Sequence, residues 1–143
     1  MAITKKKILF LGTKMQQAGA QKMQLIQSAW FHKKGHEVIS VFLYDNENLS
    51  EDWKSRYPFK VINLDVWSLQ GNIFGKLLKF LLALPRFYRF LVQNNFDIIE
   101  TFTHDSNLIG IPLGYLAGIP VRIPAHQGDI EDRIFFWKWL HGR

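Results

Sequence analysis

Short apolar blocks alternate with segments of helical periodicity along this chain, and this alternation restricts the fold more than any other feature of the sequence. The blocks are residues 8–11, 38–43, 59–64, 98–103 and 121–124. Blocks that are apolar on both faces are typical of strands in a parallel sheet that helices cover. The order therefore predicts an α/β fold with a Rossmann-like, doubly wound parallel sheet and right-handed crossovers.

Four segments are expected to form the covering helices. They are residues 19–34, 73–94, 106–118 and 131–141. The first shows Met23, Ile26 and Trp30 at helical spacing, and the last is rich in Phe and Trp. Pro85 predicts a kink or a break in the second helix. Residues 45–57, which include four acids, are expected to form a polar connection.

The composition excludes several classes of function. The 143 residues fit one domain, and 48% hydrophobic residues suffice for one core. The absence of cysteine excludes disulfides, thiolate metal sites and a cysteine nucleophile, which suits a reducing cytoplasm. The N-terminus does not have the pattern of a secretory signal, and no run reaches the roughly 20 apolar residues of a membrane span. We therefore expect a cytoplasmic protein.

A ligand site is expected where the strand order of the sheet reverses. In open α/β sheets, ligands bind at this point, beyond the carboxyl ends of the strands. In a Rossmann-like order the first and fourth strands flank the reversal. The loops to consider are then residues 12–19, residues 101–107 and the segment from 125 to 132.

The first loop contains the candidate diphosphate-binding residues Gly12, Ala18 and Gly19. It leads into a helix N-terminus, whose free N–H groups and dipole attract phosphate. Gly19 permits a close approach of the backbone to a pyrophosphate, although a flexible strand-to-helix loop explains the same residues. No glycine falls between Gly12 and Gly19, so the dinucleotide fingerprint is absent, and so is the P-loop pattern. A NAD-dependent dehydrogenase and a P-loop NTPase are therefore disfavoured.

The second loop contains Thr103, His104 and Asn107, which are candidate ligands of an acceptor substrate. Its spacing puts polar side chains at the N-terminus of a helix. Capping of a helix that begins at Ser106 or Asn107 explains part of the same pattern.

The third loop contains His126, directly after a buried strand, and Gln127 next to it. His126 is the candidate catalytic residue, because an imidazole there can contact a sugar hydroxyl or a phosphate, or move a proton near neutral pH. A histidine that only caps a turn explains the residue as well. His104 and His126 do not form a metal site, because no third ligand has a recognisable spacing.

Three stretches of the chain have the order and spacing of a known family. They are residues 18–21 with 34–38 (Ala-Gly-Ala-Gln, Lys-Gly-His-Glu-Val), residues 96–99 with 106–108 and 116–121 (Phe-Asp-Ile-Ile, Ser-Asn-Leu, Leu-Ala-Gly-Ile-Pro-Val), and residues 124–128 (Pro-Ala-His-Gln-Gly). Together they resemble the N-terminal domain of retaining GT-B glycosyltransferases of family four. Members of this family use nucleotide sugars to build polysaccharides and glycolipids.

The resemblance implies roles for two residues. Gly19 is expected near the donor diphosphate, and His126 is expected to face the reacting sugar and the acceptor. Ala18 replaces a first glycine that is common in the family, and Glu100 and Phe102 occupy places where many relatives have histidines. The resemblance also implies a nucleotide sugar as donor, a glycan or lipid-linked acceptor, and retention of the anomeric configuration. We expect no cofactor and no metal.

The resemblance further implies that residues 1–143 are the acceptor-side half of an enzyme. The family's second domain binds the nucleotide sugar and carries a spaced pair of glutamates, and nothing in the chain corresponds to it. We therefore expect no sugar transfer by the chain alone, and the end at Arg143 suggests an interruption. The alternatives are a non-catalytic acceptor- or partner-binding subunit of a split glycosyltransferase, and another nucleotide-binding doubly wound module.

A basic block lies in the middle of the chain. Residues 66–96 contain no acid, and Lys76, Lys79, Arg86 and Arg89 are interleaved there with large apolar residues. Such a helix can lie in an anionic membrane surface, which predicts a peripheral location on the inner face of the membrane. A sheet-covering helix with four solvated cations explains the block equally. Nucleic acid is not expected, because phenylalanines at helical spacing do not form a strand-borne stacking platform.

Overall fold

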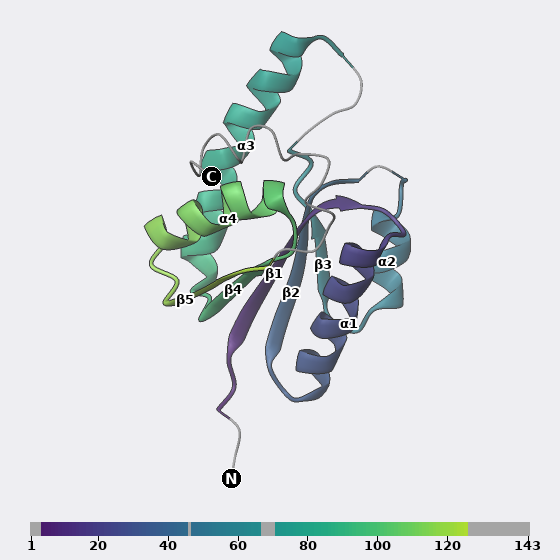
Figure 1. The fold of residues 1–143 in the computed structure, drawn as a ribbon, viewed down its shortest axis with the longest axis vertical. Coiled ribbons are helices and arrows are strands. Elements are labelled where there is room, and N and C mark those ends of the chain that lie inside the picture. The colour runs from purple at the N-terminus through teal and green to yellow at the C-terminus, as the bar shows by residue number, and fades with distance from the viewer. Residues whose placement is uncertain (1–3, 46, 67–70, 126–143) are drawn as a thin grey trace, which may run out of the picture.

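The computed structural model describes residues 4–45, 47–66 and 71–125. In these residues the strands are β1 (Lys7–Met15), β2 (Glu37–Asp45), β3 (Lys60–Asn63), β4 (Ile98–Thr101) and β5 (Val121–Pro124). The helices are α1 (Gly19–Lys33), α2 (Ser50–Arg56), α3 (Ile73–Asn94) and α4 (His104–Leu116). All strand pairs are parallel, in the order β3-β2-β1-β4-β5 (Figure 1). The predicted α/β, Rossmann-like sheet is therefore confirmed.

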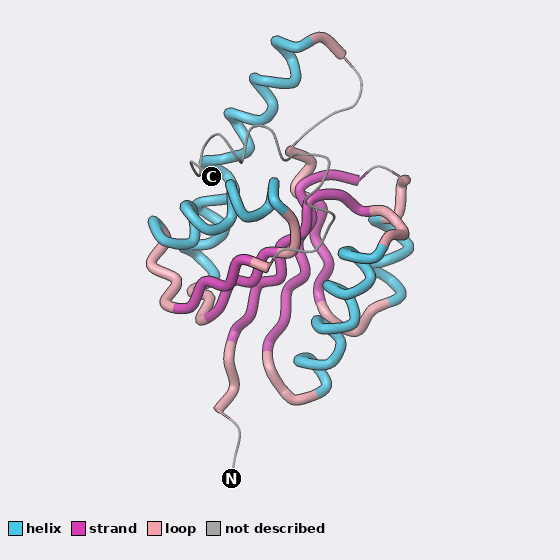
Figure 2. Tube along the Cα trace, viewed as in Figure 1, coloured by secondary structure: helices cyan, strands magenta, loops and turns pink. Residues whose placement is uncertain are grey.

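Helices cover both faces of the sheet, α1 and α2 on one face and α3 and α4 on the other (Figure 2). Successive residues of a strand point to opposite faces. In β1, Ile8 and Phe10 consequently pack in the α1–α2 layer, whereas Leu9 and Leu11 pack in the α3–α4 layer. Each layer thus has a core of its own, which is why the strands are apolar on both faces.

Strand β1 is longer than the apolar block at residues 8–11. It continues to Met15, which pairs with Asp45 of β2. Gly12 is therefore a buried residue inside the strand and not part of the loop that follows it. A Cβ atom at Gly12 would lie 2.1 Å from Oε1 of Gln24 in α1. The close packing of α1 on β1 accounts for this glycine.

The polar connection expected at residues 45–57 contains α2. The Asp45 carboxylate accepts hydrogen bonds from the backbone N–H groups of Leu49 (3.0 Å) and Ser50 (2.8 Å), which supplies partners for donors at the start of the helix. Trp53 is the buried residue of α2 and docks it on the sheet. One large apolar side chain is enough for a helix of this length, so the apolar periodicity that signals a longer helix is missing.

Two other helices differ from the prediction, α4 in its first residue and α3 in its continuity at Pro85. Helix α4 begins at His104, before the expected start at Ser106 or Asn107, because Thr103 occupies the capping position and Ser106 lies within the first turn. Helix α3 continues through Pro85 as one element. The helix expected at residues 131–141 lies outside the described residues.

Helix α1 packs on the sheet through a mostly polar face. Its buried residues are Gln21, Gln24, Leu25 and Ser28. The apolar residues with helical spacing, Met23, Ile26 and Trp30, are exposed instead. Nε2 of Gln24 contacts Oγ of Ser40 at 2.9 Å and the carbonyl oxygens of Phe10 and Val41 at 3.2 Å. These contacts with β1 and β2 fix which side of α1 faces the sheet.

Candidate functional site

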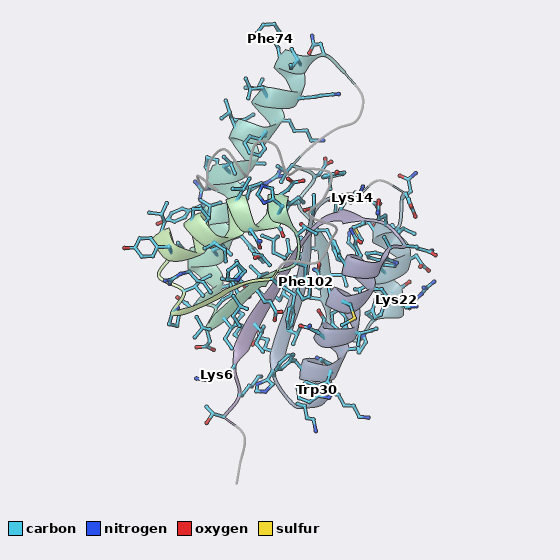
Figure 3. The ribbon with its side chains drawn as sticks, viewed as in Figure 1. Lys6, Lys14, Lys22, Trp30, Phe74 and Phe102 are labelled. Carbon is cyan, nitrogen blue, oxygen red and sulfur yellow. The ribbon has the colours of Figure 1, made fainter. Side chains whose placement is uncertain are left out.

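The strand order reverses between β1 and β4, where the sequence places the site. Strand β1 leads into α1 on one face of the sheet, and β4 leads into α4 on the other, so the two chain paths diverge at this edge (Figure 1). Lys14 lies at this edge, whereas Lys6 lies at the opposite end of the strands (Figure 3). Divergence of this kind opens a crevice for ligands in doubly wound sheets.

Hydroxyl groups join β1 to the N-terminus of α4, which follows β4. Oγ1 of Thr13, in β1, contacts Oγ1 of Thr103, the capping residue of α4. Oγ of Ser106 lies 3.0 Å from Oγ1 of Thr103 and accepts a hydrogen bond from the Thr103 N–H, also at 3.0 Å. The three hydroxyls form a continuous polar group at the reversal. Thr103 was a predicted site residue, whereas Thr13 and Ser106 were missed as site residues because single hydroxyls form no recognisable pattern in a sequence.

Asn107 connects α4 with the ends of β4 and β5. Its Oδ1 accepts a hydrogen bond from the hydroxyl of Thr101, and its Nδ2 donates to the carbonyl oxygen of Ala125 at 3.3 Å. Both ends of the amide are therefore engaged with protein atoms. Asn107, predicted to bind an acceptor, is held by these contacts beside Ala125, the last described residue before His126.

The N-terminus of α1 is open toward the same edge. Its capping residue is Ala18, whose side chain has no hydrogen-bonding group, and its first residue is the exposed Gly19. No atom lies within 4 Å of a Cβ built on Gly19. The first turn contains no acid, and Lys14, the penultimate residue of β1, lies at the same edge of the sheet (Figure 3). Free N–H groups, a helix dipole and a cation together favour an anionic ligand here.

The N-terminus of α4 has the opposite character. Thr103 and Ser106 occupy it with their own hydrogen bonds, and its first turn contains Asp105. The pKa of Tyr44, at the end of β2, is raised first by burial and second by the negative charge of Asp105. An anion already lies at this helix end, so uncharged hydroxyl groups fit it better than a diphosphate does. His104, predicted to bind an acceptor, is the half-buried first residue of α4.

Glu100 in β4 and Phe102 directly after it differ in burial. Phe102 is fully buried in the α1–α2 layer, with its ring centroid 5.9 Å from that of Phe10. Glu100 is half-buried, and this burial raises the pKa of its carboxyl group. Phe102 therefore offers no polar group to a ligand, and the polar character of this edge comes from the threonines around it.

Two groups of predicted site residues remain. His126 and Gln127 are outside the described residues. Lys76, Lys79, Arg86 and Arg89 are all in α3, on the α3–α4 side of the sheet. Within the described segments, no group of three or more His, Asp or Glu side chains is placed to hold a metal ion.

Comparison with known proteins adds information on the fold. No protein-family model and no curated protein matches the chain. Among solved structures it is similar to Acinetobacter baumannii MurG (TM-score 0.63, 18% identity, 82% of this chain and 34% of that chain). It is also similar to Anabaena Alr3699/HepE in complex with UDP and glucose (TM-score 0.58, 17% identity, 81% and 28%). A third structure is the C-terminal domain of PF1911 hydrogenase from Pyrococcus furiosus (TM-score 0.55, 12% identity, 85% and 95%).

These similarities establish the fold alone. The chain has the fold of one Rossmann-like domain of the GT-B type found in MurG and HepE, and it spans about a third of MurG (34%) and less of HepE (28%). It spans nearly all (95%) of the hydrogenase domain. One fold supports different chemistries, so the choice among functions depends on the residues at the sheet edge.

Proposed function

We propose that this chain is the acceptor-side domain of a GT-B glycosyltransferase, which transfers a sugar from a nucleotide-sugar donor to a glycan or a lipid-linked acceptor. The observation that supports the proposal most directly is the contrast between two helix ends at the strand reversal. The N-terminus of α1 favours an anion, whereas the N-terminus of α4 presents hydroxyls and an acid. A donor diphosphate and a sugar acceptor need such a pair of neighbouring environments.

The role of each residue follows from these environments. Gly19 leaves space for a phosphate against the first N–H groups of α1, and Lys14 supplies a positive charge at the same edge. Thr103 and His104 are the candidate contacts for acceptor hydroxyls, and Asn107 holds the chain that leads to His126. His126 is proposed as the catalytic residue, facing the reacting sugar.

Two structural neighbours support the same assignment. MurG and HepE are GT-B glycosyltransferases, and HepE was crystallised with UDP and glucose. In this fold, two Rossmann-like domains form a cleft that excludes water from the reaction. We therefore propose that transfer requires a second such domain, in the same chain or in a partner. Saturable sugar transfer by residues 1–143 alone would contradict this part of the proposal.

Binding of UDP and of UDP-glucose to the 143-residue protein tests the diphosphate site. We expect amide NMR signals of residues 13–19 to shift on titration. The variant Gly19→Asp puts a carboxylate where the phosphate is proposed to bind. It should weaken binding at least tenfold, while its charge at the helix N-terminus raises the free energy of unfolding by roughly 0.3–1 kcal/mol. Weaker UDP binding together with a higher free energy of unfolding cannot be explained by unfolding of the variant.

Asn72→Asp is the matched control, because it adds the same charge at the N-terminus of α3 and retains an oxygen that accepts from the Gly75 N–H. UDP binding should be unchanged in this variant. If Gly19→Asp and Asn72→Asp weaken binding equally, the effect is only one of net charge. If UDP shifts no signal in residues 13–19, the proposed diphosphate site is wrong.

A second candidate is a non-catalytic binding module. It is favoured by the near-complete overlap with the hydrogenase domain, because a single domain of this fold occurs there within another kind of protein. A module of this kind binds a nucleotide or a partner without transferring a sugar. It predicts UDP binding that survives in the 143-residue protein, with no transfer activity when a donor-binding domain is supplied.

A further inference from the structure

Lysines gather at the end of the sheet where the strands begin, opposite the candidate site. Lys6 and Trp30 lie at this end, whereas Lys14 lies at the other (Figure 3). Because the strands are parallel, the chain before β1, the C-terminal end of α1 and the start of β3 all meet here. These three segments contribute five exposed lysines, hereafter the basic end: Lys5, Lys6, Lys33, Lys34 and Lys60.

The charge of the basic end is not balanced by acids. Among the described residues, none of its five lysines has an ion-pair partner. The acids next to it are engaged by Lys7, whose Nζ lies 3.2 Å from the Glu37 carboxylate and whose backbone N–H donates to Asp97 at 2.8 Å. Cations at a helix C-terminus complement its dipole. This accounts for the two lysines at the end of α1, but not for those before β1.

Aromatic rings join the basic end into one packed surface. The backbone N–H of Lys6 donates to Nδ1 of His36 at 3.1 Å, and the His36 ring centroid lies 5.8 Å from that of Phe31. The Phe31 centroid lies 4.9 Å from that of Trp30, and Nζ of Lys34 lies 5.3 Å from the Trp30 centroid. The two lysine-bearing segments are thus connected by a row of rings, and Trp30 is its exposed member.

An apolar strip continues from Trp30 along the outer side of α1. Met23, Ile26 and Trp30 follow one another at spacings of three and four residues, which puts them on one side of the helix, and all three are exposed. The lysines lie at the end of the sheet, whereas the strip lies on the outside of the α1 layer. A ligand that contacts both therefore has to turn around the C-terminal end of α1.

We propose that the basic end and the strip of α1 bind an acidic segment of a partner protein. Its carboxylates contact Lys6 and Lys60, and an apolar side chain next to them packs on Trp30. Opposite charge provides the complementarity, and tryptophan is among the residues that contribute most to binding at protein interfaces. A polypeptide bends and combines acidic with apolar side chains, so it can follow the turn from the sheet end to the outer side of α1.

Two other anionic partners fit this surface less well. A single-stranded nucleic acid needs open aromatic faces for its bases, whereas the Trp30 ring is already contacted by Phe31 and Lys34. A lipid surface is flat on the scale of one domain and cannot touch the sheet end and the outer side of α1 together. Within the described residues, no helix is long and apolar enough to cross a bilayer.

Titration of the 143-residue protein with a short synthetic peptide, made of glutamates around one central leucine, tests the proposal. The same peptide with glutamine in place of every glutamate is the neutral comparison. We expect amide NMR signals of residues 5–7, 30–36 and 60 to shift with the acidic peptide. Binding of the neutral peptide should be about tenfold weaker, and added salt should weaken binding of the acidic peptide.

Variants of exposed residues separate a specific surface from net charge. Lys6→Gln and Lys60→Gln should each weaken binding of the acidic peptide about threefold, the effect of roughly one surface charge pair. Arg89→Gln is their matched control, because it removes one exposed cation from α3 on the opposite face of the sheet. It should bind like the wild type. Thermal unfolding should be unchanged in all three variants, since the side chains are exposed.

Trp30→Ser tests the apolar contact and should weaken binding about tenfold. Its matched control is Tyr115→Ser, because Tyr115 in α4 is also exposed and also has a cation over its ring, with Cζ of Arg122 at 5.2 Å. Tyr115→Ser should bind the acidic peptide like the wild type. An equal loss in the two variants would contradict a role of the α1 strip.

Three results would overturn the proposal. The first is equal binding of the acidic and the neutral peptide. The second is an equal loss in Lys6→Gln and Arg89→Gln, which would indicate a response to net charge alone. The third is tighter binding of oligouridylate or of phosphatidylglycerol vesicles that Lys6→Gln and Trp30→Ser both weaken, which would assign the surface to another partner. UDP binding should be unchanged in Lys6→Gln, so this proposal and the proposed function can fail separately.

Discussion

Helices α1 and α3 cover opposite faces of one sheet and use their side chains in opposite ways. Helix α1 buries Gln24 and Ser28 and exposes Ile26. Helix α3 buries Phe87 and Leu91 and exposes large apolar side chains in its N-terminal half as well. An apolar stripe in a sequence therefore predicts that a helix exists, but not which of its sides meets the sheet. In α1 the side is chosen by hydrogen bonds of Gln24, and in α3 by the aromatic and aliphatic residues that fit the sheet.

The largest effect is expected from the buried face of α3. Phe87→Ala should lower the free energy of unfolding by about 3–5 kcal/mol, because Phe87 is fully buried against the sheet. Leu78→Ala, which truncates an exposed side chain of the same helix, should change it by less than about 0.5 kcal/mol. Chemical denaturation measures both. Similar losses in the two variants would mean that Leu78 is covered by protein.

The polar packing of α1 predicts a coupling between two residues. Gly12→Ala should lower the free energy of unfolding by roughly 1–3 kcal/mol, because the new Cβ overlaps Oε1 of Gln24. In a Gln24→Ala background the same change should be much less harmful, since the overlapping atom is gone. A double-mutant cycle by denaturation gives the coupling energy. Additive losses would show that the side chain of Gln24 is not the reason why position 12 requires glycine.

The two helices also differ at their N-termini. Asn72 caps α3, with its Oδ1 accepting from the Gly75 N–H at 2.8 Å, whereas Ala18 leaves α1 without a side-chain cap. Asn72→Ala should therefore lower the free energy of unfolding by about 1 kcal/mol, and Ala18→Asn should raise it by a similar amount. Thermal unfolding of both variants tests this pair. A loss on introducing Asn at position 18 would indicate that the N-terminus of α1 already has partners.

The smallest effect concerns Glu100, a polar residue within the apolar sheet. Burial raises the pKa of Glu100 in the folded protein, so the folded protein binds this proton more tightly than the unfolded chain does. Stability should fall as pH rises from the ordinary glutamate pKa through the raised value, and should then be level. Glu100→Gln should match the wild type at acid pH and exceed it slightly near neutrality. Melting temperatures of the wild type and of Glu100→Gln over this pH range measure the difference, with Glu47→Gln as the exposed control. A wild-type stability that rises with pH relative to Glu100→Gln would contradict the prediction.

The sequence predicts the sheet well because each strand is buried on both faces. The continuous apolar blocks that result do not depend on which helix covers them. The predicted reversal of strand order between β1 and β4 follows from the helical segments between the blocks. Helix α2 and the true end of β1 were missed for a physical reason. Trp53 alone docks α2, and Gly12 and Thr13 look like a loop although they are buried within a strand.

The candidate site is predictable only in part. The sequence indicates the sheet edge and Thr103, and the open N-terminus of α1 agrees with the emphasis on Gly19. It does not reveal that Thr13 reaches Thr103 across the strand reversal, because residues 90 positions apart are joined only by the sheet register. Nor does it reveal that Asn107 is occupied by Thr101 and Ala125.

Pro85 has a consequence for the exposed N-terminal half of α3. Proline has no N–H, so the carbonyl oxygen of Leu81, one turn earlier, lacks its helical donor. Leu81 is exposed, so water can take the place of that donor. Any surface that covered this turn of α3 would therefore have to supply a hydrogen-bond donor of its own or leave the turn in water.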